Sequence, residues 1–168
     1  MITRPQSNEH APFYSTYLDK VEGDPYELMV TQPERLTEFI EENEDRLDYA
    51  YAEGKWTIRQ AVMHMVDTEQ VFAYRLLTIA RGDKTELPGF DQNVFIDNTD
   101  FSHLDAGDLI RVVENQRAFT FSLLNTITTD KLENMGVASG YDVSVRALIF
   151  MMAGHMEHHL EIFKERYQ

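Results

Sequence analysis

Apolar residues recur every three or four positions in four separate segments of the chain, which is the period of an amphipathic helix. The segments span residues 24–43, 57–81, 108–127 and 144–166. Signals for strands are weak throughout. The pattern therefore predicts an all-α fold, and four such helices in one chain suggest a four-helix bundle.

Residues typical of helix ends flank these segments. Thr57 and Gln60 have the spacing of a capping box, and Ser144 is a suitable cap for the last helix. Gly82 directly follows the second segment and predicts its end. Pro33 lies inside the first segment, so we expect a kink or a break in that helix.

The connection between the second and third helices is long and spans residues 83–105. A connection of this length usually crosses the end of a bundle or forms a lid. No repeat, low-complexity tract or linker divides the chain. We therefore expect a single domain over residues 1–168, with residues 1–12 as a loose N-terminal arm.

Composition excludes several classes of function. The chain has 168 residues and no cysteine, so disulfides, thiolate metal ligands and a cysteine nucleophile are ruled out. Its formal net charge of −14 argues against binding to nucleic acid or to anionic membranes. The N-terminus lacks the apolar core of a signal peptide, and no apolar run approaches the ~18 residues of a membrane span. We expect a cytoplasmic protein that does not span a membrane.

Two of the six histidines form a pair on the last predicted helix. His155 and His159 are four residues apart, which places both rings on one face, one turn apart. Met152 and Phe163 lie on the same line, so this face is apolar and should point inward. Surface histidines are the alternative, but unpaired polar groups facing a core are costly. A shared metal ion would satisfy both rings.

His64 is the candidate third ligand, because it lies among apolar residues of the second predicted helix. A histidine that simply packs in the core is the alternative for this position. His158 points about 100° away from the pair and should lie at the rim. His10 and His103 lie in polar loops. Three neutral histidines leave coordination positions open, which is typical of catalytic metal sites.

Two further residues of the second helix are candidate catalytic groups. Asp67 lies three residues after His64 and could orient a ligand imidazole or accept a proton, unless it is an ordinary exposed carboxylate. Arg75 lies about three turns along the same face and could bind an anionic group of a substrate. An ion pair with a nearby acid is the alternative for Arg75. Glu69 and Glu157 are expected to be solvated.

These residues lie in sequence blocks that resemble the DinB/YfiT-like superfamily. The first block is Gly-Lys-Trp-Thr-Ile-Arg-Gln at 54–60, followed by His64, Asp-Thr-Glu at 67–69 and Arg75. Leu-Pro-Gly-Phe-Asp at 87–91, Val-Ser-Val-Arg-Ala-Leu at 143–148 and Gly-His-Met-Glu-His-His at 154–159 resemble the later blocks. The resemblance covers residues 14–167.

The resemblance implies a four-helix bundle that carries one divalent transition metal, nickel, zinc or manganese, on His64, His155 and His159. Family members of known activity are thiol S-transferases that join bacillithiol, mycothiol or a related low-molecular-weight thiol to an electrophile. One branch contains a glutathione-linked isomerase, and older descriptions call the group hydrolases. Family members often pair their bundles, so a homodimer is implied.

Three functions follow as hypotheses. In a thiol S-transferase, the metal would bind the small thiol as thiolate, and Arg75 could hold the carboxylate of that thiol. Asp67 would orient one of the histidines that bind the metal. In a metal-dependent hydrolase, the same site would activate water. The third is a non-catalytic stress protein that binds a metal or ligand. Turnover that depends on a thiol separates the first two.

Overall fold

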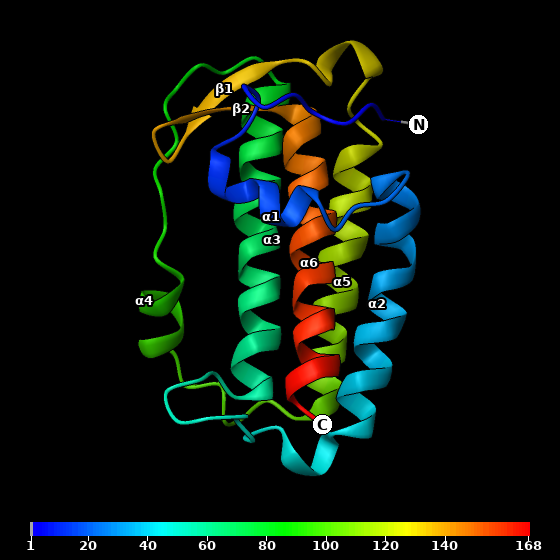
Figure 1. The fold of residues 1–168 in the computed structure, drawn as a ribbon, viewed down its shortest axis with the longest axis vertical. Helices are drawn as coiled ribbons and strands as arrows, with labels where there is room; N and C mark the ends of the chain where they lie inside the picture. The colour runs from blue at the N-terminus through cyan, green and yellow to red at the C-terminus, as the bar shows by residue number, and fades with distance from the viewer. Residues whose placement is uncertain (1) are drawn as a thin grey trace.

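The computed structural model describes residues 2–168, and its four long helices lie side by side as a bundle (Figure 1). These are α2 (Pro25–Glu42), α3 (Ile58–Ala80), α5 (Ala106–Leu124) and α6 (Val145–Arg166). The predicted all-α four-helix bundle is confirmed. Across residues 2–168, no helix has the length and apolarity needed to cross a bilayer.

Side-chain caps set the beginnings of the helices. The Thr57 side chain accepts a hydrogen bond from the Gln60 backbone amide, and the Gln60 side chain accepts one from the Thr57 backbone amide, so the predicted capping box is present. Ser144 caps α6 as predicted. α5 begins two residues earlier than predicted, because Asp105 and Asp108 form a second capping box. Hydrogen bonds between a capping side chain and the first backbone amides thus fix where these helices begin.

Helix direction explains the long crossover. α2 and α6 run one way along the bundle, whereas α3 and α5 both run the other way (Figure 1). The chain must therefore return along the whole bundle between α3 and α5. It does so along the outer side of α3, and this crossover contains the short helix α4 (Gln92–Asp97).

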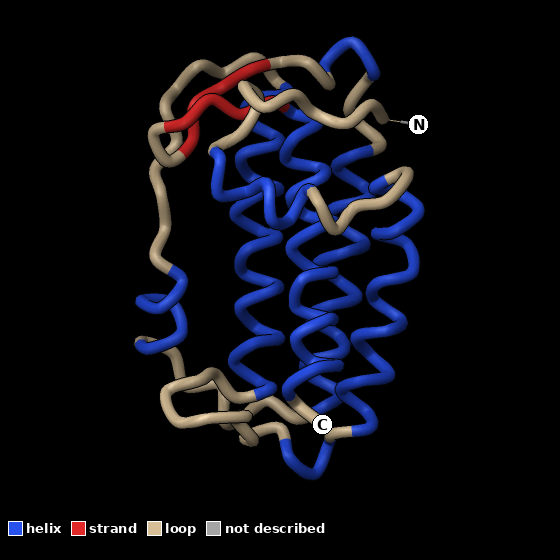
Figure 2. The backbone as a smooth tube through the Cα atoms, in the orientation of Figure 1, coloured by secondary structure: helices blue, strands red, loops and turns tan. Residues whose placement is uncertain are grey.

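A small hairpin that the sequence did not predict covers one end of the bundle (Figure 2). Strands β1 (Met135–Ala138) and β2 (Tyr141–Ser144) pair antiparallel. Ser139 and Gly140 form the turn with φ of 57° and 78°, the left-handed geometry that two-residue hairpin turns favour. Leu87 of the crossover bridges to Ala138 of β1. The hairpin thus ties the start of the crossover to the bundle.

The N-terminal segment packs against the bundle and is not the loose arm expected from the sequence. Ile2 and Ala11 are buried, and the Glu9 carboxylate accepts hydrogen bonds of 2.7 Å from both Ser144 Oγ and Arg146 Nε. The hydrogen bond from Arg146 lowers the pKa of Glu9 to about 2. The segment therefore fastens to the start of α6. Its partner is 137 residues away in the sequence, so no local pattern could reveal it.

α2 runs through Pro33 without the break that the sequence had suggested. A proline in a helix leaves the carbonyl four residues earlier without its usual donor. Here that carbonyl belongs to Met29, and Arg117 Nη1 donates to it at 2.9 Å. A side chain from α5 therefore replaces the missing hydrogen bond, and the helix continues.

Short elements at the N-terminus bring aromatic residues onto α6. A 3-10 helix, η1 (Pro12–Tyr14), leads into α1 (Ser15–Leu18), which crosses α6. The crossing is so close that a Cβ atom on Gly154 would lie 2.0 Å from the Tyr17 carbonyl oxygen. Only glycine fits there without movement of the backbone. The contact places the Tyr17 ring edge-on against His155, with centroids 5.2 Å apart.

We expect Gly154→Ala to lower the free energy of unfolding by about 2–4 kcal/mol, because the clashing atoms are backbone and cannot rotate away. Urea denaturation measures this change. Gly89→Ala is a matched control, since its Cβ would meet Ser139 Oγ at an ordinary 3.5 Å. Equal stability of the two variants would mean that α1 does not cross α6 so closely.

Candidate metal centre

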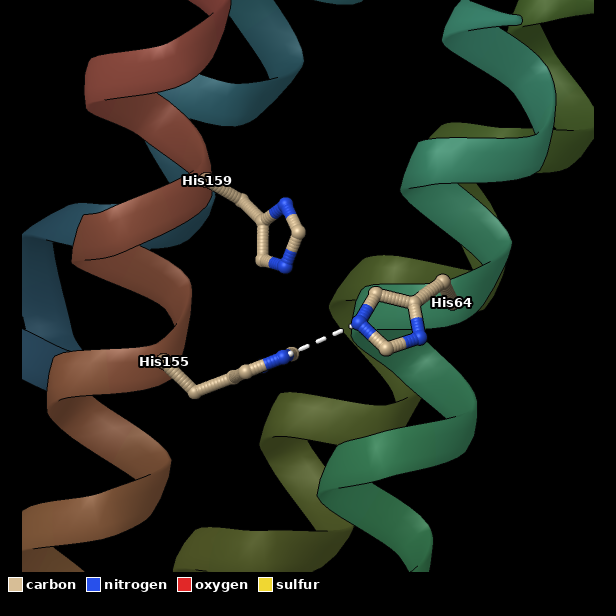
Figure 3. A group of neighbouring side chains, drawn as sticks. All are labelled: His64, His155 and His159. Atoms are coloured by element: carbon tan, nitrogen blue, oxygen red, sulfur yellow. Dashed lines mark hydrogen bonds between the residues drawn. The ribbon is translucent and has the colours of Figure 1, made fainter. Parts of the chain in front are cut away.

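The three predicted ligand histidines lie together between α3 and α6. His64 projects from α3, and His155 and His159 project from α6 toward it (Figure 3). One nitrogen from each ring can be chosen so that all three lie within 4.8 Å of one another. His64 Nε2 and His155 Nε2 are 3.1 Å apart. The structure therefore brings together the side chains that the sequence pattern paired.

Helix geometry and packing hold the rings in place. His155 and His159 occupy successive turns of α6, with ring centroids 4.6 Å apart. The His64 ring lies 5.0 Å from the first and 4.9 Å from the second. Trp56 packs on the His64 ring at 4.6 Å, and Thr68 Oγ1 lies 3.4 Å from His64 Nδ1. These neighbours orient Nε2 of His64 toward α6.

Burial keeps the three imidazoles neutral. The exposed fractions of His64, His155 and His159 are 3%, 4% and 9%. Desolvation lowers the pKa of His64 to about 4, and it lowers the pKa of the other two well below the usual value, with further lowering from neighbouring histidines. A neutral imidazole has a free ring nitrogen lone pair, which is the form that binds metals.

The arrangement fits a divalent transition metal. Bonds from such an ion to histidine nitrogen are about 2.0–2.1 Å long, so two ligand nitrogens of one ion can lie ~3–3.5 Å apart. The 3.1 Å separation of His64 Nε2 and His155 Nε2 suits this geometry. A cation among the three rings would satisfy all of them.

The other histidines lie outside the cluster. The His158 ring packs between Tyr17, at 5.4 Å, and His159, at 5.2 Å, and is part-buried at the rim. His10 Nδ1 lies 3.0 Å from the Ala11 carbonyl oxygen, and His103 is exposed. This separation of the six histidines agrees with the expectation from sequence spacing.

Asp67 is not brought to the cluster by any contact in the described chain. It is part-buried, and this desolvation raises the pKa of its carboxyl. The neighbour of the His64 ring is Thr68 instead. A step of four residues turns a helix by about 400°, close to a full turn, whereas a step of three turns it by only about 300°. Thr68 therefore lies more nearly above His64 than Asp67 does.

Arg75 is buried with an exposed fraction of 2%, and no carboxylate of residues 2–168 forms an ion pair with it. Its Nη2 donates at 2.9 Å to both the Pro88 carbonyl and Ser139 Oγ. Its guanidinium carbon lies within 6.0 Å of the ring centroids of Phe72 and Phe90. Arg75 thus joins the crossover to the hairpin turn, and the ion pair considered as its alternative role is not present.

Two cavities reach the histidine cluster. The larger has a volume of about 440 Å³ and is bordered by His155. The smaller has a volume of about 270 Å³ and is bordered by His159. No aspartate or glutamate borders either cavity within the described chain. Volumes of several hundred cubic ångströms suit small molecules.

Glu69 was expected to be solvated and is instead buried between α3 and α5. It accepts hydrogen bonds from Arg117 Nη2 at 2.9 Å and from Thr120 Oγ1 at 2.6 Å. A sequence signal existed, because Glu69 continues the i, i+3, i+4 spacing of the apolar stripe of α3. Glu157 is also not freely solvated, because Arg35 binds both of its oxygens, at 2.7 and 2.8 Å.

Comparisons with known proteins show what this chain is similar to. The model of the DinB superfamily matches residues 28–163. A protein of Oceanobacillus iheyensis named "putative metal-dependent hydrolase" is 31% identical over 137 residues, which cover 80% of this chain and 78% of that protein. The fold is similar to that of YfiT from Bacillus subtilis, described as "a probable metal-dependent hydrolase with an unusual four-helix bundle topology". That match has a TM-score of 0.72 at 17% identity and covers 97% of this chain and 90% of the other.

Proposed function

The chain belongs to the DinB superfamily, and from this premise we propose that it is a metal-dependent thiol S-transferase. His64, His155 and His159 would hold one divalent transition metal, with nickel, zinc and manganese as the proposed ions. The reaction would join a low-molecular-weight thiol to an electrophile. The observation that carries the proposal is a cluster of three neutral imidazoles beside cavities without a carboxylate.

The missing carboxylate favours transfer over hydrolysis. A hydrolase needs a group that accepts the proton of the attacking water. Asp67 was the one candidate from the sequence, and it borders neither cavity. A thiol needs less assistance, because its ordinary pKa is already far lower than that of water.

Each group of the chain has a defined task in this proposal. A bound ion would lower the pKa of a thiol at the open coordination positions and so supply a thiolate. The thiol proton goes to solvent water. The thiolate sulfur forms a bond to the electrophilic carbon while the bond from that carbon to its leaving group breaks, and the leaving group departs with the bonding electron pair. Phe72 and Phe90 help to exclude water from the larger cavity. Arg75 holds the wall of this cavity in place through Ser139.

Metal-dependent hydrolysis is the second candidate, because the relatives in Oceanobacillus and Bacillus carry that description. The same three histidines would then bind the ion that activates water. The proposed reactants of either reaction are small molecules of the cytoplasm. Pairing of two bundles into a homodimer stays a prediction.

The test compares thiol transfer with hydrolysis in metal-loaded protein. We expect conjugation of monochlorobimane to bacillithiol, mycothiol or cysteine, and no comparable hydrolysis of 4-nitrophenyl acetate without a thiol. Chelation and His64→Ala should each abolish the conjugation, whereas the exposed control His103→Ala should retain it. Hydrolysis that persists without any thiol, and that His64→Ala abolishes, would replace this proposal with the hydrolase.

A further inference from the structure

The two cavities at the histidine cluster are bordered by different ligand histidines. His155 borders the larger cavity and not the smaller, whereas His159 borders the smaller and not the larger. Because these rings lie on successive turns of α6, the cavities approach the cluster at two levels along the helix. Such an arrangement gives two molecules separate access to one centre.

The larger cavity has walls that are rich in aromatic residues. Five of its bordering residues are aromatic and come from η1, α1, α3 and the crossover, namely Phe13, Tyr14, Tyr17, Phe72 and Phe90. Among residues 2–168, no aspartate, glutamate, lysine or arginine borders it. Aromatic walls favour planar apolar groups, which can stack or meet them edge-on.

The smaller cavity also has aromatic and aliphatic walls, but it differs from the larger one in having a cationic side chain at its border. Among residues 2–168, Lys55 is the one lysine or arginine that borders it, and its side chain is exposed. Tyr51, Tyr167 and Asn93 add groups that can form hydrogen bonds. Tyr167 donates its hydroxyl proton to the Trp56 carbonyl at 2.7 Å, and burial raises its pKa to about 12, so this tyrosine is neutral. On a chain with net charge −14, a lysine without an acid beside it in the cavity favours an anionic group there.

The first turn of α4 contributes one bordering residue to each cavity. Gln92 borders the larger cavity, and the next residue, Asn93, borders the smaller. Both side chains are exposed, and the Asp91 cap holds the turn by accepting a hydrogen bond from the Asn93 amide at 2.9 Å. Neighbouring residues of one helical turn thus face two different cavities.

We propose that the two cavities are separate binding sites for the two reactants, an aromatic electrophile at His155 and a carboxylate-bearing thiol at His159. The assignment rests on the proposed transferase function. Lys55 binds the carboxylate of the thiol, and the aromatic walls take the planar group of the electrophile. The sulfur and the electrophilic carbon then meet at the cluster, where the two cavities converge.

Binding to the cobalt(II)-loaded full chain tests this without turnover. N-acetylcysteine is the thiol probe, and the charge-transfer absorbance between thiolate and cobalt reports its binding. 1,3-Dinitrobenzene is the unreactive aromatic probe, and equilibrium dialysis reports its binding without favouring either cavity. We expect each probe to bind while the other saturates the protein, with dissociation constants changed by less than about twofold. Mutually exclusive binding would overturn the assignment of two sites.

The matched variants Gln92→Phe and Asn93→Phe identify which cavity each probe occupies. Phenylalanine fills space at either position and adds no charge. We expect Gln92→Phe to weaken dinitrobenzene binding by about tenfold and leave N-acetylcysteine unchanged, and Asn93→Phe to do the reverse. Lys55→Gln should weaken only N-acetylcysteine. If both phenylalanine variants weaken the same probe, or neither probe, the assignment is wrong.

The outcomes separate this proposal from the proposed function. If the crossed pattern of binding is found but the wild-type protein transfers no thiol, the transferase function fails and the two sites stand. If transfer is found while the crossed pattern is missing, the assignment of the cavities fails and the transferase function stands.

Discussion

Replacing His155 with alanine is expected to leave a folded protein that no longer retains a transition metal. The variant removes one of three imidazoles that face one another, and with it the Nε2 atom that lies 3.1 Å from His64 Nε2. Loss of a group that only orients a ligand already lowers metal affinity by about 10–100-fold, so loss of a ligand should lower it by at least about 100-fold. His64→Ala and His159→Ala should have the same effect.

Elemental analysis of untagged protein measures the bound metal directly. The wild-type protein should carry close to one ion per chain, and the melting temperature should fall when a chelator removes it, because binding to the folded state stabilises that state. The His155→Ala variant should show neither property. His158→Ala is the matched control, since its ring lies on the same turn of α6 but outside the cluster. Full metal content in His155→Ala would exclude this site.

The bundle and the histidine pair could be predicted because the information is local. Thr57 with Gln60 and Ser144 set helix starts within one turn of sequence, and the structure has the same caps. The spacing of His155 and His159 determines that they share a face of α6. His64 followed only because it lies on the apolar face of another helix. Each of these inferences uses only the helical period of about 3.6 residues and the residue types within one turn of a helix end.

The remaining features depend on contacts between distant segments. The hairpin has strands of four residues each, too short for an alternating pattern to stand out. Glu9 is buried because Arg146 reaches it, and Arg75 is held by groups from the crossover and from the hairpin turn. Asp67 was chosen for its helical spacing, but a difference of one position gave Thr68 the contact with His64. Sequence spacing orders the residues along a helix, but it does not select their partners.

Glu69 and Arg117 form a buried ion pair between α3 and α5, with exposed fractions of 4% each for the two side chains. Arg117 also donates to the Met29 carbonyl in α2, so the pair connects three helices of the bundle. The Nε atom of Arg117 is buried without a hydrogen-bond partner in the described chain. Burial removes both charges from water, which costs desolvation free energy, and it leaves the Arg117 Nε donor unsatisfied. The ion pair therefore contributes less to the free energy of unfolding than the attraction between its two charges alone suggests.

We therefore expect a double-mutant cycle at this pair to be strongly non-additive. Glu69→Leu alone should lower the free energy of unfolding by about 3–5 kcal/mol, because it leaves the Arg117 guanidinium buried without a counter-charge. Arg117→Met alone should cost a similar amount by leaving the Glu69 carboxylate buried. The double variant should be more stable than either single variant, since apolar side chains of similar size then replace both charges.

Urea denaturation of the four proteins measures the cycle, and the exposed pair of Arg4 and Asp19 provides the control. Their side chains are 49% and 71% exposed, so Asp19→Asn should change the free energy of unfolding by less than about 1 kcal/mol. A double variant whose loss equals the sum of the two single losses would show that the charges act independently. In that case the pair would not be the link between α3 and α5 that its burial indicates.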